Sequence, residues 1–271
     1  MEIKYYKINP TGNITLIVET AVPRELQADV AAKLMALDTE AEQVGFIEAP
    51  ANADCELRLQ MMGGEFCGNA SIATAALCMS KLKPSPDDTK TVIIEVSGAD
   101  KPLELSVKCL DENKFSGTLS MPLPESNFDC ELVYKGESHT LPVIRVPGIC
   151  HAIVTSGISA PYAEEAIAEW CRQLDAEALG IMFYNAAEGL LRPLVYVQST
   201  GSIVWESSCA SGSCAVSAYE SFKRGKSVKL SLRQPGGTLS VKSFCTQAVL
   251  FGINLTGTAE ICGEYSVVID T

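Results

Sequence analysis

The chain has 271 residues, of which 47% are apolar and 20% are charged, and its formal net charge is −12. This length allows two domains with substantial cores, and the acidic excess argues against nucleic-acid and anionic-membrane partners. No apolar run approaches the roughly 18 residues of a membrane span, and the polar start, MEIKYYKINPTGN, lacks the apolar segment of a signal peptide. We therefore expect a cytoplasmic protein.

The first half of the chain predicts helices alternating with β-rich segments. After Pro23, apolar residues recur on one helical face: Leu26, Val30, Leu34 and Leu37. A glycine-rich turn, GGEFCGNA at 63–70, then leads into a helix of small residues at 71–82. Two β-rich runs separated by a glycine follow at 91–98 and 103–108.

The second half repeats this order. After Pro161, a second helical face is formed by Ala163, Ile167, Trp170 and Leu174. The turn SSCASGSC at 207–214 leads into a helix at 215–225, for which Gly225 is a suitable C-cap. Two β-rich runs follow again, at 228–237 and 238–242. The repetition indicates a duplicated α+β unit.

The duplication predicts two domains with a boundary near residues 115–120. The first would contain residues 1–117, with 259–271 returning to it, and the second would contain residues 118–258. Two equivalent halves folded against each other create a cleft, where sites are common. Cys67 and Cys209 take equivalent positions in the two halves, so pseudo-two-fold symmetry would make them face each other.

The two equivalent cysteines point to stereoinversion of an amino acid. Removing an α-proton needs a base on one face, and returning a proton to the other face needs an acid, and a thiolate and a thiol can serve as both. A helix start lowers the pKa of a thiol, and its N–H groups can bind a carboxylate. The residues expected to present these amides are Gly68, Asn69, Ala210 and Ser211.

The other nine cysteines suggest no second chemistry. Eight are predicted to be reduced core filler: Cys55, Cys78, Cys109, Cys130, Cys150, Cys171, Cys245 and Cys262. Cys214 is interpreted as packing or as a second thiol near the site. The chain has no CxxC pair, which a thiol–disulfide protein would favour, and only two histidines, His139 and His151, too few for a usual zinc module.

FCGNA at 66–70 and SCASGSCA at 208–215 resemble the diaminopimelate epimerase family, whose two catalytic cysteines lie in such turns. The resemblance spans nearly the whole chain. It implies two pseudo-symmetric domains, each a β-barrel-like sheet around a central helix, with the active site in the interdomain cleft and neither pyridoxal phosphate nor metal. It further implies that Asn13, in KINPTGN, contacts the substrate and that His151 pairs with the first cysteine.

The chain departs from the epimerases before its second cysteine. Those enzymes carry Glu-Arg-Gly there, and the Arg clamps a distal carboxylate, whereas residues 199–208 read STGSIVWESS. Residues 149–151, Ile-Cys-His, likewise replace the family's Asn-Pro-His. A substrate with a second carboxylate would therefore lack its bidentate partner.

Other segments resemble the histidine racemase branch, namely EQVGFIE at 42–48, Trp205-Glu206, and QPGG at 234–237. This resemblance implies histidine as substrate. Gln43 and Phe46 are candidates to shape the side-chain pocket, with a structural role as the open alternative for each. The resemblance further implies that Glu206 binds the substrate ammonium or orients the thiol.

Alternative interpretations stay open at this point. The chain could racemise another amino acid or epimerise diaminopimelate; a proline racemase is disfavoured because Gly68-Asn69 stands where that branch usually has Gly-His. A different class is an inactive ligand-binding protein of the same fold. We expect a small amino-acid ligand, no nucleic-acid or membrane partner, and allow for a homodimer.

Overall fold

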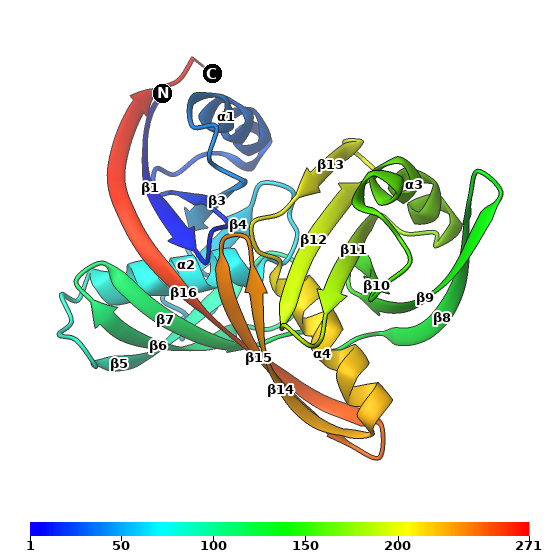
Figure 1. Cartoon of the computed structure of the whole chain (residues 1–271). Coiled ribbons are helices and arrows are strands. Elements are labelled where there is room, and N and C mark those ends of the chain that lie inside the picture. Colours follow the sequence, from blue (N-terminus) through cyan, green and yellow to red (C-terminus); the bar gives the residue numbers. More distant parts are fainter. Residues whose placement is uncertain (271) are drawn as a thin grey trace. The chain divides into compact units, whose positions relative to one another are not determined.

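The computed structural model describes residues 1–270 and shows a mixed α+β fold dominated by strands (Figure 1). This confirms the predicted α+β class. The chain divides into two compact units: unit 1 comprises Met1–Ser120 and the C-terminal residues from Thr256, and unit 2 comprises Met121–Leu255. Within residues 1–270, no helix has the length and apolar character needed to cross a membrane.

Unit 1 contains two helices among its strands. Its elements are β1 (Glu2–Pro10), β2 (Thr15–Val18), α1 (Arg24–Leu37), β3 (Gln43–Glu48), β4 (Leu57–Met61), α2 (Gly68–Ser80), β5 (Thr89–Val96), β6 (Leu103–Asp111), β7 (Lys114–Ser120) and part of β16 (Val249–Val268). The strands pair in chain order from β1 to β7, followed by β16, which also pairs with β1. The strand path of unit 1 therefore returns to its start. The two pairs joined through a helix, β2 with β3 and β4 with β5, run parallel.

Helix α1 follows the predicted periodicity with one exception. Val30, Ala31 and Leu34 are buried, and they pack in an apolar cluster that includes Val44 of β3. Leu37, predicted to share this face, is 64% exposed because it is the last residue of the helix. The predicted helix is therefore confirmed, and its apolar face ends at Leu34.

Helix α2 is almost completely buried. Its contacts are with strands β1, β2, β5, β6 and β7. Small residues let this happen: a Cβ at Gly117 of β7 would lie 2.8 Å from Ile72 of the helix. The helix begins at Gly68, three residues before the predicted start, which makes Cys67 its N-cap.

Unit 2 repeats the pattern of parallel pairs joined by helices. Its elements are β8 (Ser126–Tyr134), β9 (Glu137–Val146), β10 (Ile149–Val154), α3 (Ala160–Gln173), β11 (Ala178–Asn185), β12 (Leu190–Val197), β13 (Ser202–Trp205), α4 (Ala210–Arg224), β14 (Lys226–Gln234), β15 (Gly237–Thr246) and the start of β16. The strand order is β16-β15-β14-β12-β11-β10-β9-β8, and β13 pairs with β12. The parallel pairs are β10 with β11, joined through α3, and β12 with β14, joined through α4.

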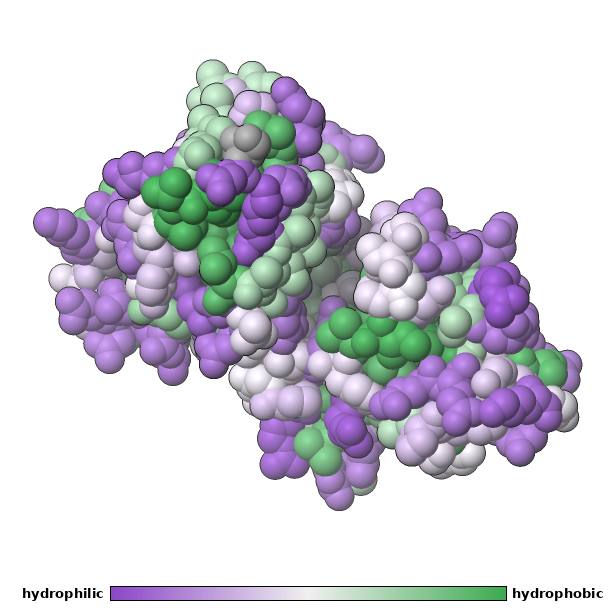
Figure 2. Space-filling view, turned by 90° about the horizontal axis from the view of Figure 1, so that it is seen from above, coloured by the Kyte–Doolittle hydropathy of each residue, from purple (hydrophilic) through white to green (hydrophobic). Residues whose placement is uncertain are grey.

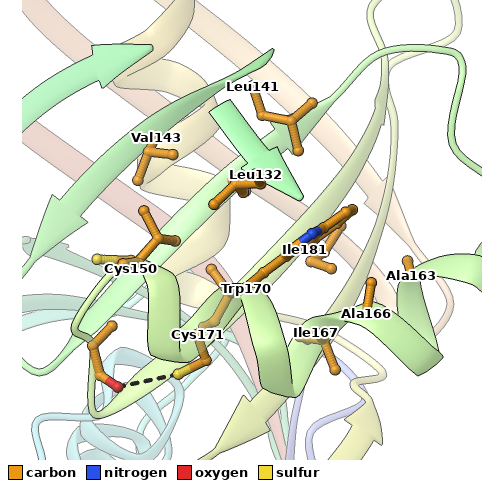
Figure 3. Packing of buried hydrophobic residues seen from close by; sticks show 14 of the residues in the cluster. Leu132, Leu141, Val143, Cys150, Ala163, Ala166, Ile167, Trp170, Cys171 and Ile181 are labelled. Atoms are coloured by element: carbon orange, nitrogen blue, oxygen red, sulfur yellow. Dashed lines mark hydrogen bonds between the residues drawn. The ribbon is translucent and has the colours of Figure 1, made fainter. Parts of the chain in front are cut away.

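The core of unit 2 lies between α3 and the sheet (Figure 3). Ile167 and Trp170 of α3 are fully buried, as the periodicity predicted. They pack with strand residues such as Leu132, Val143 and Ile181. Cys171 belongs to the same cluster, and its thiol donates to the carbonyl of Ala176 at 3.1 Å. The helix C-terminus is thereby fixed from inside the core.

The cysteines predicted as filler behave in three ways. Five are buried: Cys55, Cys109, Cys150, Cys171 and Cys245. Cys78 and Cys130 are half-buried. The prediction is wrong for Cys262, which is exposed, because it lies on the same outward face of β16 as Glu260 and Glu264.

The space-filling view shows hydrophilic residues over most of the visible surface, interrupted by apolar patches (Figure 2). Ile203 and Val204 of β13 are among the exposed apolar residues. Two residues after Val204 comes Glu206, which faces the second cysteine.

Candidate active site

Cys67 is the N-cap of α2. Its backbone is extended, with φ −131° and ψ 113°, and its sulfur accepts a hydrogen bond from the Ala70 amide at 3.4 Å. The Ser71 hydroxyl donates to the Cys67 carbonyl at 2.7 Å. A cysteine thus takes the place in which Ser or Thr usually satisfies the free amides of a first helical turn.

Cys209 repeats this arrangement at the start of α4. Its backbone has φ −120° and ψ 112°, and its sulfur accepts from the Gly212 amide at 3.3 Å. The Ser213 hydroxyl donates to the Cys209 carbonyl at 2.6 Å. Each unit therefore holds one thiol in the same local geometry, at the positive end of a helix.

In unit 1, the thiol belongs to a chain of side-chain hydrogen bonds. Cys67 Sγ donates to Gln43 Oε1 at 3.1 Å, and Gln43 Nε2 donates to Asn13 Oδ1 at 2.5 Å and to Thr15 Oγ1 at 2.8 Å. Asn13 Nδ2 in turn donates to the Glu42 carboxylate. The structure therefore brings the predicted residues Asn13 and Gln43 to Cys67.

The carboxylate at the end of this chain sets the direction of every bond in it. A carboxylate such as that of Glu42 only accepts, so Asn13 must turn its NH2 toward Glu42 and its oxygen toward Gln43. Gln43 must then turn its own oxygen toward Cys67. Glu42 thus makes the neighbour of Cys67 a neutral acceptor.

In unit 2, the thiol instead lies beside a carboxylate. Cys209 is 5% exposed and is hydrogen-bonded to Glu206, and its sulfur is 3.5 Å from the Ser211 hydroxyl. Burial, reinforced by the charge of Glu206 and by its hydrogen bond, raises the pKa of the Cys209 thiol well above its usual value. The Ser211 hydroxyl and the Gly212 amide oppose this shift only in part. The environment of Cys209 favours the protonated thiol.

His151 extends the network of Cys209. It is fully buried in β10, and its Nε2 lies 3.1 Å from the Ser211 hydroxyl. A Cβ at Gly180 would clash with its Nδ1, so the neighbouring strand must carry glycine there. Burial lowers the pKa of His151 to about 3, which keeps the ring neutral. Its predicted pairing with Cys67 joins two units and stays a prediction.

The remaining predicted site residues lie either in the first turns of α2 and α4 or in the apolar cluster beneath α1. Gly68, Asn69, Ala210 and Ser211 form the first turns of α2 and α4. Phe46 is 1% exposed in the cluster beneath α1, and the alternation of β3 turns it away from Gln43. The structure does not bring Phe46 to the hydrogen-bonded chain of Cys67, and its role in a substrate pocket stays a prediction.

Several residues of these networks were not predicted. Ser71 and Ser213 both stand four residues after a cysteine, so a comparison of the repeated turns could have found them. Glu42 and Gln234 have no such local signal, because their partners are distant in sequence. Among residues 1–270, no group of three or more His, Cys, Asp or Glu side chains is placed to hold a metal ion.

The geometry is suited to proton transfer and anion binding. Each thiol can carry one proton, and the helix behind it directs amides and a positive dipole end toward the thiol. A family model, the histidine racemase CntK N-terminal domain, matches residues 2–267 of the chain.

Two relatives are named histidine racemase. The protein from Fusobacterium nucleatum subsp. nucleatum is 33% identical over 249 residues, which cover 88% of this chain and 87% of the relative. The protein from Staphylococcus aureus is 25% identical over 253 residues, which cover 89% and 88%.

Solved structures share the fold. A probable proline racemase from Agrobacterium radiobacter K84 has a TM-score of 0.72 at 16% identity, covering 99% of this chain and 93% of that chain. A PhzF-family phenazine biosynthesis protein from Bacillus anthracis has a TM-score of 0.70 at 13% identity, covering 99% and 100%. These likenesses concern the fold, whereas the family model and the relatives extend along nearly the whole sequence. The chain therefore belongs to the histidine racemase family.

Proposed function

We propose that the chain racemises histidine and that Cys67 and Cys209 are its two acid–base groups. The observation that carries this proposal is the repeated cap, in which one cysteine begins the buried helix of each unit and accepts an amide hydrogen bond from the first turn. Packing in a core does not favour cysteine at a helix N-cap, so its presence at both N-caps supports a functional role. The names of the relatives support the substrate.

The reaction needs one thiolate and one thiol. The thiolate takes the α-proton, so the electron pair of the C–H bond stays on the α-carbon and is delocalised into the carboxylate. The other thiol then donates its proton to the opposite face of that carbon. The product is the enantiomer, and the protonation states of the two cysteines are exchanged, so the reverse reaction uses the same groups with their roles swapped.

The carboxylate must be stabilised as negative charge develops on it. Helix N-termini bind anions through their free amides and their dipole. Gly68, Asn69, Ala210 and Ser211 supply the first turns of the two helices that begin at the cysteines. Asn13, Gln43 and Glu206 are proposed to contact the remaining polar groups of the substrate.

The surroundings of Cys209 favour a neutral substrate side chain. No Arg or Lys occurs between Arg192 and Lys223. Arg192 itself stacks over the Trp205 ring at 4.8 Å, and the indole donates to Glu164. A distal carboxylate without a cationic partner would lose several kcal/mol on desolvation, about a hundredfold in rate for each ~2.7 kcal/mol. Neutral imidazole avoids most of this penalty.

We further propose that units 1 and 2 are duplicated halves of a diaminopimelate epimerase-like fold, each a β-barrel-like sheet around a central helix. The closed strand path of unit 1 and the shared order of helices and parallel strand pairs support this. The halves are proposed to be residues 1–117 with 259–271, and residues 118–258. Catalysis is proposed to use no cofactor, and the molecule is proposed to act on a small amino acid, as a homodimer.

Deuterium uptake at the α-carbon in D2O tests the substrate and the chemistry together. Purified protein is incubated separately with L-histidine, D-histidine, other aromatic and polar amino acids, and diaminopimelate, and a Cys67→Ser/Cys209→Ser protein serves as control. We expect uptake and inversion of histidine and little of either with diaminopimelate. Faster uptake into diaminopimelate would overturn the substrate, and binding of histidine without uptake would indicate an inactive ligand-binding protein.

A further inference from the structure

In both units, the strand after the central helix reaches back to the cysteine-bearing turn. In unit 1, the Ser97 hydroxyl at the end of β5 donates to the carbonyl of Glu65 at 2.8 Å. In unit 2, the Gly236 amide after β14 donates to the carbonyl of Ser207, also at 2.8 Å. Glu65 and Ser207 each stand two residues before the cysteine of their unit. This contact fixes the turn, but it does not touch the cysteine itself.

Gln234, the last residue of β14, holds Cys209 directly. It is 7% exposed, and its Oε1 accepts from the Cys209 amide at 2.8 Å. Its Nε2 donates to the Ser213 hydroxyl at 2.9 Å, and that hydroxyl donates to the Cys209 carbonyl at 2.6 Å. One buried carboxamide and one serine thus engage both main-chain polar groups of Cys209.

We propose that Gln234 is a positioning residue for Cys209, which fixes the place of its sulfur relative to the reacting carbon. The inference rests on the proposed function, in which Cys209 exchanges a proton with the substrate. Gln234 reaches the thiol only through the main chain, so it has no part in the proton transfer itself.

The chemistry of the relay explains why this residue is a glutamine. A carboxamide offers one acceptor and one donor on the same short group, as the Cys209 amide and the Ser213 hydroxyl require. A carboxylate would satisfy the amide and lose the donor. An apolar side chain would leave a buried amide without its partner, at a cost that favours movement of the turn.

If Cys209 is displaced, we expect deuterium uptake and inversion to change differently for the two enantiomers. For the enantiomer that Cys209 deprotonates, both deuterium uptake and inversion slow down. For the other enantiomer, Cys67 still removes the α-proton, but Cys209 delivers its proton slowly. The carbanion then returns to Cys67, and it takes up deuterium without inverting whenever the Cys67 thiol has exchanged with solvent. The ratio of uptake to inversion therefore rises for one enantiomer only.

The experiment measures uptake and inversion from both enantiomers of histidine in D2O, for wild type, Gln234→Ala and Gln234→Met. The methionine variant keeps the side-chain length if the alanine variant folds poorly. We expect inversion to fall about tenfold or more, as for a small misplacement of a reacting group. The uptake-to-inversion ratio should rise for a single enantiomer, and the rate of iodoacetamide alkylation should change at Cys209 and not at Cys67.

Two matched variants complete the design. Gln27→Ala removes another buried carboxamide, which donates to Val22 and Glu48 in unit 1, and should lower stability without changing either ratio. Ser97→Ala loosens the turn of Cys67 and should raise the ratio for the opposite enantiomer. An uptake-to-inversion ratio that rises equally for both enantiomers, or for neither, in the Gln234 variants would overturn the positioning role. A wild-type protein that neither exchanges nor inverts histidine would overturn the proposed function instead.

Discussion

The two cysteine turns share a backbone and differ in their neighbours. Cys67 and Cys209 have nearly the same φ and ψ, and each sulfur accepts a hydrogen bond from the backbone amide three residues later. A serine follows each cysteine after four residues. Yet Cys67 donates to the neutral amide of Gln43, whereas Cys209 lies beside the carboxylate of Glu206. The comparison teaches that the cap places the thiol, while side chains from other elements decide how readily it ionises.

The strongest way to break the comparison is to remove one thiol at a time. Cys67→Ser and Cys209→Ser should each lower inversion by about a hundredfold to ten-thousandfold, the range of general acid–base catalysis, because a serine hydroxyl is too weak an acid to supply the base form. Chiral chromatography of histidine after incubation measures the loss.

The two serine variants should also differ from each other. Each retains the thiol that deprotonates one enantiomer, so any residual deuterium uptake should favour opposite enantiomers in the two proteins. Circular dichroism confirms that both remain folded. Near-wild-type turnover in either variant would show that the two-thiol mechanism is wrong.

Exchanging the charges beside the thiols sharpens the comparison. Burial is the main cause of the raised pKa of Cys209, and Glu206→Gln removes the charge that adds to it. That pKa should therefore fall, and Cys209 alkylation by iodoacetamide at neutral pH should accelerate about tenfold per unit of pKa. Gln43→Glu places a carboxylate beside Cys67 and should slow its alkylation. Peptide mass spectrometry reads the two sites separately.

Each substitution should change the thiol beside it much more than the thiol of the other unit, which provides the internal control. If the Glu206→Gln substitution changed alkylation at both cysteines equally, the difference between the turns would not be local. Glu42→Gln is a milder variant: it removes the acceptor-only end of the Asn13–Gln43 chain, so the two amides can reverse. It should alter alkylation at Cys67 less than Gln43→Glu does.

Acid should lower the stability of unit 2 through its histidines, because both histidines of the sequence lie in that unit. Both tryptophans, which report its unfolding, lie there too. The pKa of buried His151 is lowered to about 3, so between about pH 6.5 and pH 3 the unfolded chain binds a proton that the folded chain does not. Stability should therefore fall as the pH falls through this window, by at most about 1.4 kcal/mol per pH unit. Urea unfolding followed by tryptophan fluorescence measures it.

His151→Gln is the matched variant, since its amide can still reach Ser211 and does not titrate in this range. Its stability should decline less steeply with acid than that of the wild type. Identical slopes in the two proteins would mean that His151 is already protonated in the folded state, or is not the titrating group.

The smallest expected effect is on stability, and it concerns the C-termini of α2 and α4, which also differ. Helix α4 closes at Gly225 with a left-handed φ of 64°, whereas α2 closes at Lys81 in right-handed conformation. Gly225→Ala should cost about 1 kcal/mol of unfolding free energy, measured by urea denaturation. Because the cysteines lie at the opposite end of the helix, the alkylation rates of both thiols should stay unchanged.

Local patterns are sufficient to predict the helices and the equivalent positions of the two cysteines. The helical faces after Pro23 and Pro161 and the C-cap Gly225 depend on neighbours within a few residues, which a sequence displays directly. The predicted starts of α2 and α4 lie three and five residues after the observed starts, because the sequence analysis assigns the residues that follow each cysteine to a turn. The cysteines themselves are the caps.

The partners of the thiols could not be predicted to the same degree. The Gln43 amide that meets Cys67 is 24 residues away, and the Gln234 amide that meets Cys209 is 25 residues away. Such contacts depend on which strands become neighbours and on their register, and no local pattern encodes these. Resemblance identified Gln43 and Glu206 by position, but it could not show that one thiol meets an amide and the other a carboxylate.

Strand β16 also constrains how the chain can fold during synthesis. It runs from Val249 to Val268, begins in unit 2 and ends in unit 1, where it pairs with β1 from Glu2↔Val268 onward. The N-terminal ammonium group of Met1 donates to the carbonyl of Ile269, 268 residues away. The first 120 residues of unit 1 therefore leave the ribosome before unit 2, but their sheet cannot be completed until β16 has been synthesised, and contacts of such sequence separation form slowly. A nascent chain stopped at Leu255 should contain the sequence of unit 2 in full and leave β1 and β7 of unit 1 as open edges.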